Sequence, residues 1–243
     1  MNTFFKFYLQ SWVLLSLAAG FALAELFDLG LSARVRRVLV PAFVAASAIC
    51  LAYLPCALYG RAQTRFTPHA PLALNGEAFF ATAVYSRDGT ALRLADDYRM
   101  IQWLRANTGR NDILLEAQLP EYRWGGRMSV FTGRQTVLGY RHHQSQQRPI
   151  TALGEAIALR KQNVQAIYAG EDASATLAAL QHYGVDYLVI GGLERAVYPA
   201  AGLAKFAAMC ARGELVRVYQ VGDDLIYRVV HPAGDLPVYG AHW

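Results

Sequence analysis

Two long uncharged stretches near the N-terminus constrain the fold of this chain more than any other feature. No charged residue lies in residues 7–24 or in residues 38–60. At about 1.5 Å per residue, the second stretch makes a helix of roughly 35 Å, which exceeds the hydrocarbon thickness of a bilayer, about 30 Å. The first stretch is near the lower length limit. We therefore predict two transmembrane helices, at about residues 7–27 and 38–59.

A cleaved signal peptide is the main alternative for the first stretch. Lys6 and the small-residue sequence LAAGFALA fit that interpretation loosely. Tyr8 and Trp12, however, are typical of a membrane–water interface, and a second span follows that a secreted protein does not need. A buried core helix is the alternative for the second stretch, but such helices rarely lack polar residues on every face. We interpret residues 1–60 as a two-helix membrane hairpin with the lipid bilayer as partner, and expect Asn2, Lys6 and Tyr8 at its interface.

The basic residues that flank the two spans leave the orientation open. The short link between the spans carries Arg34, Arg36 and Arg37, which favours a cytoplasmic link. The opposite side carries the terminal amine, Lys6, Arg61 and Arg65. The two sides are therefore nearly balanced in positive charge.

Composition excludes several classes of function. The net charge is +5, but the basic residues are scattered singly rather than grouped as in a phosphate-tracking surface, so we expect no nucleic-acid partner. The three cysteines, Cys50, Cys56 and Cys210, cannot form a disulfide framework or a four-cysteine metal site. Zinc-ligand spacing is missing, and we expect neither a metal nor a cofactor.

The pattern changes after residue 60. Residues 61–75 contain two prolines and no periodicity, which is typical of a linker. Residues 76–243 have the pattern of a globular domain. Tyr98, Ile101 and Leu104 form one stripe of a predicted helix at 95–109, with Asp96 and Asp97 at its start.

Further elements of this domain alternate between helix and strand. Apolar runs predict strands at 112–117, 136–140 and 185–192, and helical patterns predict helices at 171–184 and 202–213. Asp172 or Ser174 is the expected N-cap of the helix at 171–184. Val221-Gly-Asp-Asp224 separates two strands of a hairpin, at 214–220 and 225–230. The predicted class is α/β: a transmembrane hairpin, then a two- or three-layer domain with a mostly parallel sheet and a C-terminal β-hairpin.

Residues 114–149 form the densest polar stretch of the domain. Glu116 ends a predicted strand, and His142 and His143 follow the next one. Because ligands gather at the carboxyl ends of parallel strands, a carboxylate, an imidazole and Arg127 or Arg148 could converge there as base, acid and anion clamp. The alternative is structural: an arginine near Glu116 forms a satisfied ion pair that only orders a loop, and adjacent histidines point in different directions.

Standard catalytic motifs are missing from the sequence. The stretch GGRMSVFTG lacks the Gly-Lys-Ser/Thr of a phosphate loop, and no Gly-x-Ser-x-Gly elbow surrounds Ser129. VIGGLE, after a predicted strand, lacks the dinucleotide fingerprint. A hydrolase built on Glu116 and His143 has no recognisable nucleophile.

Three segments together resemble the YYY membrane-protein family. They are MNTFFKFYLQSWVLL, GRMSVFTGRQTVLGYRHHQSQQR and YGVDYLVIGGLER. That family consists of large polytopic membrane proteins of uncharacterised function, grouped by resemblance with the GT-C glycosyltransferases, which use lipid-linked sugar donors. In the family, a segment similar to residues 1–8 lies deep inside the chain after many spans. The resemblance therefore implies that this chain corresponds to the C-terminal portion of the family, with its globular domain extracytoplasmic.

The resemblance also has a departure that bears on chemistry. The family's Gly-Trp-x-x-His-Glu-x-Gln-Trp-Arg run reads Gly139-Tyr140-x-x-His143-Gln144-x-Gln146-Gln147-Arg148 here. Gln144 cannot act as a general base, whereas His143, Gln146 and Arg148 can still hydrogen-bond a sugar or a phosphate. The candidate ligand-binding residues are Glu116, Tyr122, Arg127, Ser129, Thr132, His143, Gln146 and Arg148.

These observations lead to two expectations about function. The first is a multi-pass cell-membrane protein related to glycosyl transfer from lipid-linked donors. It would lack the catalytic half of a GT-C enzyme and be inactive alone, because no acidic cluster lies near its spans. Its partners would be that multi-span half or another membrane protein, and a lipid-linked sugar. The second is a non-catalytic module that binds a carbohydrate or lipid-phosphate head group or assembles a membrane complex.

Overall fold

The computed structural model describes residues 2–65, 71, 73–87, 89–147 and 151–232. The chain divides into two compact units, Met1–Phe66 and Thr67–Trp243.

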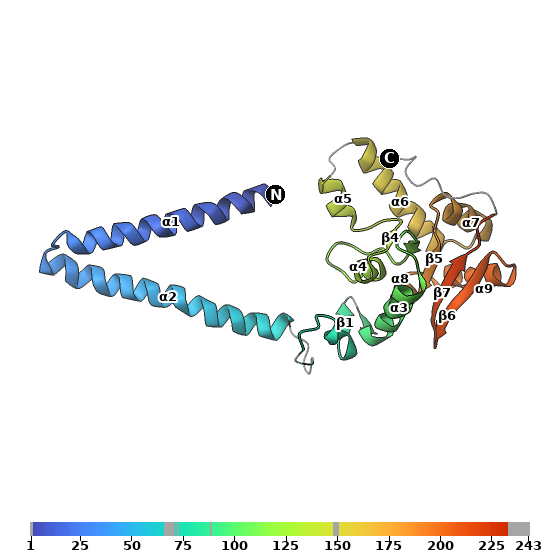
Figure 1. The fold of residues 1–243 in the computed structure, drawn as a ribbon, viewed down its shortest axis with the longest axis horizontal. Helices are drawn as coiled ribbons and strands as arrows, with labels where there is room; N and C mark the ends of the chain where they lie inside the picture. Colours follow the sequence, from blue (N-terminus) through green and yellow to red (C-terminus); the bar gives the residue numbers. More distant parts are fainter. Residues whose placement is uncertain (1, 66–70, 72, 88, 148–150, 233–243) are drawn as a thin grey trace. The chain divides into compact units, whose positions relative to one another are not determined.

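The first unit consists of two long apolar helices joined by a short turn (Figure 1). These are α1 (Asn2–Asp28) and α2 (Ala33–Arg65). Both are long and apolar enough to cross a membrane, and none of their apolar segments is buried. Lys6 and Tyr8 are exposed on α1, as are most described residues of that helix, and Asn2 belongs to its first turn.

Both helices extend beyond the uncharged stretches that predicted them. The expected bounds were 7–27 and 38–59, whereas α1 runs from Asn2 to Asp28 and α2 from Ala33 to Arg65. The predicted linker at 61–75 is therefore helical over residues 61–65, and its residues 66–70 and 72 lie outside the described part. The difference arises because the length of an uncharged stretch indicates only the part that can lie in lipid. The helix itself continues into flanking residues such as Arg, Ala and Gln, which also favour helix.

The second unit opens with short elements and a helix. The 3₁₀ helix η1 (Ala78–Ala81) precedes the antiparallel pair β1 (Val84–Arg87) and β2 (Thr90–Arg93). Next comes α3 (Leu94–Asn107), which confirms the helix predicted from the stripe that includes Ile101 and Leu104. Both of those side chains are fully buried.

A five-stranded mixed sheet forms the centre of the unit, in the order β4-β3-β5-β7-β6. Its strands are β3 (Ile113–Leu115), β4 (Gln135–Thr136), β5 (Tyr187–Ile190), β6 (Leu215–Val221) and β7 (Asp224–Val229). β3 pairs in parallel with β4 and β5, and β7 pairs antiparallel with β5 and β6. The C-terminal hairpin is confirmed.

The expectation of a mostly parallel sheet is replaced by this mixed one. The second strand of the hairpin, β7, inserts beside β5, so that β6 runs parallel to β5 without being its neighbour. Nothing in a hairpin's own pattern decides which of its strands joins the sheet. The strand predicted at 136–140 is also shorter, since β4 ends at Thr136. Beyond it, the Leu138 carbonyl accepts a hydrogen bond from the Gln118 side chain and not from a neighbouring strand.

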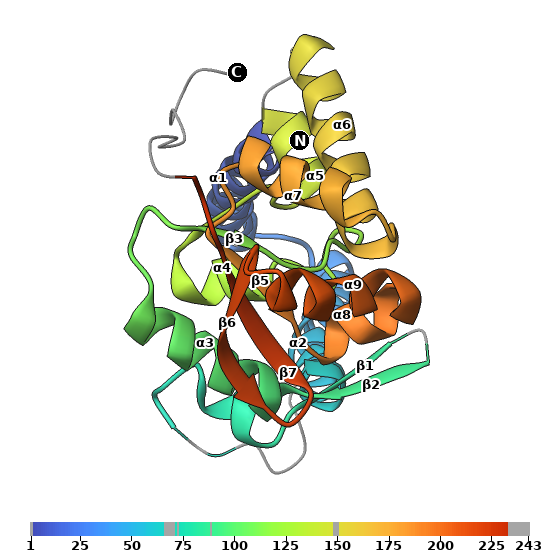
Figure 2. The ribbon, with the colours of Figure 1, turned by 90° about the vertical axis from the view of Figure 1, so that its right-hand side faces the viewer.

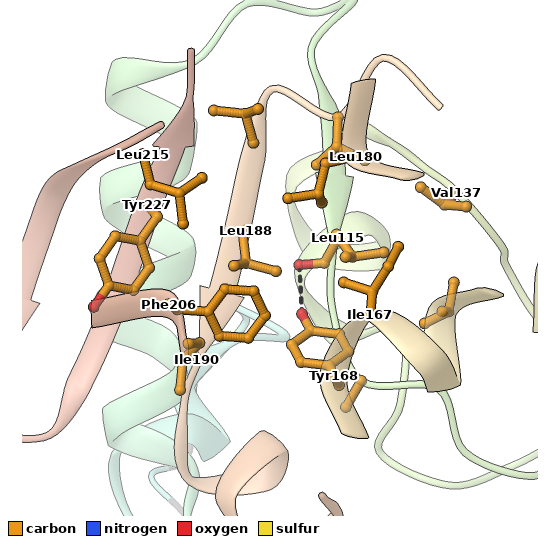
Figure 3. Close-up of a cluster of buried hydrophobic side chains, with 14 of the residues drawn as sticks. Leu115, Val137, Ile167, Tyr168, Leu180, Leu188, Ile190, Phe206, Leu215 and Tyr227 are labelled. Carbon is orange, nitrogen blue, oxygen red and sulfur yellow. Dashed lines mark hydrogen bonds between the residues drawn. The ribbon is translucent and has the colours of Figure 1, made fainter. Parts of the chain in front are cut away.

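Helices cover both faces of the sheet, which makes three layers. Besides α3, the helices of this unit are α4 (Arg127–Thr132), α5 (Arg141–Gln147), α6 (Thr151–Ala169), α7 (Ala173–His182), α8 (Gly192–Val197) and α9 (Ala200–Ala211). Leu115 and Leu188 point into a core shared with α6, α7 and α9, shown in Figure 3. Leu114 and Val189, their neighbours in sequence, point into a second core with η1, α3 and α4. Figure 2 shows α3 and α9 on opposite sides of the β6–β7 pair.

Close contact between α9 and the end of α6 fixes the first of these cores. Lys205 donates to the carbonyls of Ile167 at 2.5 Å, Gly170 at 2.6 Å and Gly202 at 2.8 Å. This caps carbonyls at the end of α6 that lack partners inside their own helix. Burial lowers the pKa of Lys205 to about 8.

Candidate functional site

The carboxyl ends of β3 and β5 form the candidate site. The two strands are parallel neighbours, and the chain leaves them in opposite directions: from β3 to β4 on one side, and from β5 towards β6 and β7 on the other. In open α/β sheets, ligands bind in the crevice at such a reversal of strand order. In this chain the reversal is filled by side chains.

Arg127, at the start of α4, lies at the centre of the buried side chains that occupy this place. It is 2% exposed. Its guanidinium binds the Glu194 carboxylate through two hydrogen bonds, Nη1 to Oε1 at 3.1 Å and Nη2 to Oε2 at 2.9 Å. Its Nε lies 2.8 Å from Oδ1 of Asp97 on α3. Asp97 also accepts a hydrogen bond of 2.6 Å from the indole of Trp124.

Glu194 connects the ends of the two parallel strands. Its carboxylate accepts hydrogen bonds of 2.8 Å from the N–H of Ala117, after β3, and from the N–H of Gly191, after β5. A Cβ added at Gly191 would lie 2.6 Å from the Met100 methyl carbon and 3.1 Å from Arg127. A side chain at this position would therefore make Met100 and the Arg127–Glu194 pair shift.

Glu116 is the third buried carboxyl of the cluster, and it is fully buried. Its two oxygens accept hydrogen bonds from the backbone N–H groups of Met128, at 2.7 Å, and Ser129, at 2.9 Å. These donors belong to the first turn of α4, where backbone N–H groups have no partner within the helix. Glu116 thus holds α4 to the end of β3.

The electrostatics identify Arg127 and Glu194 as the ionised pair. Burial alone would raise the pKa of Glu194, but the Arg127 charge and hydrogen bonds outweigh burial and hold that pKa below its usual value. Burial raises the pKa of Glu116 and of Asp97 above their usual values, although the Arg127 charge acts in the opposite direction. One cation therefore stands among three carboxyls of unequal acidity.

This cluster fits the structural interpretation of Glu116 and Arg127 and not the catalytic one. A general base needs a free oxygen within hydrogen-bond reach of a substrate proton. Both oxygens of Glu116 are instead taken by the backbone of α4, in a place closed to solvent. The contacts made by Arg127 order the loop between β3 and α4.

Two other predicted residues, Ser129 and Thr132, belong to the same helix. Ser129 donates to the Gly126 carbonyl at 3.0 Å, and Thr132 donates to the Met128 carbonyl at 2.6 Å. Their hydroxyls are used inside α4 and its N-terminal turn. The structure thus brings four of the predicted residues together, Glu116, Arg127, Ser129 and Thr132, without forming an open site.

Tyr122 and His143 form a separate patch on the surface. The Tyr122 hydroxyl lies 3.2 Å from His143 Nε2, and the His143 ring also packs edge-on against Tyr140. Tyr122 is 77% exposed, yet its φ is 62°, in the left-handed region that costs about 1–3 kcal/mol for such a residue. Gln146 is exposed on α5, in the helix that also carries His143. Arg148 lies outside the described residues.

Sequence reasoning missed two members of the buried cluster. Asp97 was assigned only to the start of a helix, and Glu194 was assigned no role. A signal for Glu194 exists in the sequence: it stands three residues after Gly191 at a strand-to-helix junction, the spacing at which a glutamate accepts from a helix's first N–H. For Asp97 no local pattern points to Arg127, which belongs to a different helix on the same face of the sheet.

Within the described residues, no group of three or more His, Cys, Asp or Glu side chains is arranged to hold a metal ion. The comparisons with known proteins add no assignment: no family model matches the chain, and no curated protein matches it.

Proposed function

We propose that this chain is a membrane-anchored, non-catalytic α/β module that works beside a multi-span membrane protein. The resemblance to the YYY family makes glycosyl transfer from a lipid-linked donor the associated reaction. The two exposed apolar helices support the anchor, because side chains of this kind are stable in lipid. The catalytic carboxylates would come from the partner.

The closed ionic cluster is the observation that carries the proposal. The reversal of strand order is the place where open α/β sheets bind their ligands. Here Glu116, Asp97 and Glu194 are at most 4% exposed and are held by Arg127, an indole and backbone N–H groups. Such a cluster stabilises a fold but offers no group to a substrate.

A transfer assay tests the lack of catalysis. The purified full chain in lipid nanodiscs would be given polyprenyl-phosphate sugars and acceptor peptides or glycans. We expect no product above that of empty nanodiscs. Product formation by the chain alone, abolished by Glu116→Gln, would overturn the proposal, because the buried carboxyl would then be reactive.

The Tyr122–His143 patch supports a second candidate function, recognition of a carbohydrate or lipid-phosphate head group without chemistry. An exposed aromatic ring held in a strained backbone conformation is more costly than a glycine at the same place. Retaining tyrosine there is explained if the ring meets a ligand, with His143 and Gln146 as hydrogen-bonding neighbours.

Paired variants test this patch. Tyr122→Gly relieves the left-handed strain and should keep or raise stability, while Tyr122→Gly and His143→Ala should both lower binding of nanodiscs that contain polyprenyl phosphate. His182→Ala, on the exposed face of α7, is the matched control. Unchanged binding by both patch variants would exclude the patch as the recognition surface.

The proposed orientation places the α/β unit outside the cytoplasm, with Arg34, Arg36 and Arg37 inside. Protease added to intact spheroplasts should then digest the unit and leave the two apolar helices in the membrane. Digestion only after the spheroplasts are lysed would reverse the orientation.

A further inference from the structure

A second site lies beside the buried cluster and shares only Asp97 with it. A cleft of about 460 Å³ lies where β2, the first turn of α3, the start of α8 and the β6–β7 turn meet. This volume is in the range of small-molecule sites. The cleft shares no residue with the Tyr122–His143 patch.

Four of the charged side chains that line the cleft form two ion pairs with one another. Arg99 lies 2.5 Å from Asp96, and Arg195 lies 2.6 Å from Asp224. Asp97 also lines the cleft, but Arg127 and Trp124 hold its two oxygens from the inside, so it acts only as a wall.

Arg93 and Asp223 remain available to a ligand. Both line the cleft and are exposed, and neither side chain has a hydrogen bond or ion pair within the described part of the chain. The Arg93 guanidinium offers a planar set of hydrogen-bond donors, and the Asp223 carboxylate offers two acceptor oxygens. Because one positive charge matches one negative charge, a charged ligand gains little net attraction.

The remaining lining is small or apolar. Leu92 and Val221 offer hydrocarbon surface, and Gly192 and Gly222 leave backbone accessible between them. A ligand that is neutral, carries many hydroxyls and has a C–H face uses all of these features together. Each hydroxyl can accept from Arg93 or donate to Asp223.

We infer that this cleft binds a neutral polyhydroxylated ligand, a short sugar chain, between Arg93 and Asp223. The inference goes beyond the proposed function and does not require it. The sugar can be free or can be the head group of a membrane glycolipid, since both present the same chemistry.

Calorimetric titration tests the inference. The full chain in phosphatidylcholine nanodiscs would be titrated with neutral di- and trisaccharides of glucose, galactose, mannose and N-acetylglucosamine, with glucuronate, glucosamine and glycine as charged and zwitterionic comparisons. We expect a neutral sugar to bind, and hydrogen exchange to slow at residues 91–93 and 221–224. Binding of only the charged or zwitterionic compounds, or no binding of any neutral sugar at about 10 mM, would overturn the inference.

Variants assign the binding to the cleft. Arg93→Gln and Asp223→Asn should each weaken the sugar's affinity about tenfold, because each removes a charge-assisted hydrogen bond. Arg217→Gln, on the exposed part of β6 outside the cleft, should leave affinity unchanged. Equal affinity in all three variants would place the sugar elsewhere and refute the assignment.

Nanodiscs that contain a glycolipid with the same sugar distinguish the two sources. Slowed exchange at residues 91–93 without added free sugar identifies the glycolipid, and slowed exchange only with free sugar identifies the soluble ligand; both outcomes support the cleft. A glycosyl-transfer assay that failed or succeeded would leave this result unaffected.

Discussion

At the scale of single residues, Arg127 has the largest consequences. It is the only cation whose contacts reach Asp97 and Glu194 among the described residues, and all three side chains are removed from water. Breaking a buried ion pair is far more costly than lacking one, because a charge is left without a partner. The neutral form of the remaining carboxyls then becomes the favoured one.

Arg127→Met should therefore lower the free energy of unfolding by about 3–5 kcal/mol at neutral pH. Urea titration of the full chain in nanodiscs, followed by near-ultraviolet circular dichroism, measures it. The matched control Arg217→Met, on an exposed position of β6, should change stability by less than about 0.5 kcal/mol.

The pH dependence separates charge from packing. Without Arg127, the pKa values of the buried carboxyls rise, so the folded state takes up protons and the variant's deficit shrinks as the pH falls from about 7 to about 5. A deficit that stays constant over this interval would mean that Arg127 acts by filling space.

Lys205 provides a second prediction at this scale. Burial lowers its pKa from 10.5 to about 8 in the fold. Between those values the unfolded chain binds more protons, so the free energy of unfolding contributed by Lys205 increases as the pH rises. The stability difference between the wild type and Lys205→Met should shift in favour of the wild type from about pH 8 to about pH 10.5. A difference that is flat with pH, or that shifts towards the variant, would contradict this assignment.

At the scale of elements, the passage from β5 to α8 is closely packed. A Cβ added at Gly191 would displace the ends of the Met100, Arg127 and Glu194 side chains. Gly154, within α6, has nothing within 4 Å of an added Cβ. Substitution of glycine by alanine should therefore lower stability at Gly191 and raise it at Gly154.

Gly191→Ala should destabilise the α/β unit by about 1–3 kcal/mol, the usual cost of overpacking. Gly154→Ala should stabilise it by about 0.5–1 kcal/mol, because alanine favours the helix. The urea titration described for Arg127 measures both. Equal effects of the two substitutions would show that the passage into α8 relaxes around a side chain.

Elements with a strong local pattern could be predicted from the sequence, and others could not. The N-cap of α7 is confirmed, since Asp172 accepts from the N–H groups of Ser174 and Ala175. The 19-residue helix α6 was missed: its polar residues are spread among alanines, and the core contacts of Val164, Ile167 and Tyr168 come late in the helix. The buried Tyr168 hydroxyl shares its proton between the carbonyls of Leu115 (Figure 3) and Val189, long-range contacts that no local pattern encodes.

In the candidate site, too, local features could be predicted from the sequence and long-range contacts could not. The sequence grouped Glu116 with Arg127 because they lie close together along the chain and near a strand end. It could not show that Asp97 and Glu194 arrive from α3 and α8 to enclose Arg127. Burial depends on the packing of the whole sheet, so it separates the structural interpretation from the catalytic one only once the fold is known.

At the scale of the whole molecule, the two apolar helices are the dominant feature. Large side chains such as Phe4, Trp12 and Leu51 are 66–72% exposed, a surface that water disfavours and lipid accepts. The α/β unit has its own two hydrophobic cores and does not use these helices for its interior.

Alkaline extraction of membranes tests that central claim most directly. After expression of the full chain, membranes would be washed with sodium carbonate at high pH, which removes peripheral proteins but leaves integral ones. We predict that the intact chain stays in the pellet and enters solution only with detergent, whereas a chain that begins at residue 71 is released. Recovery of the intact full chain in the carbonate supernatant would contradict the account.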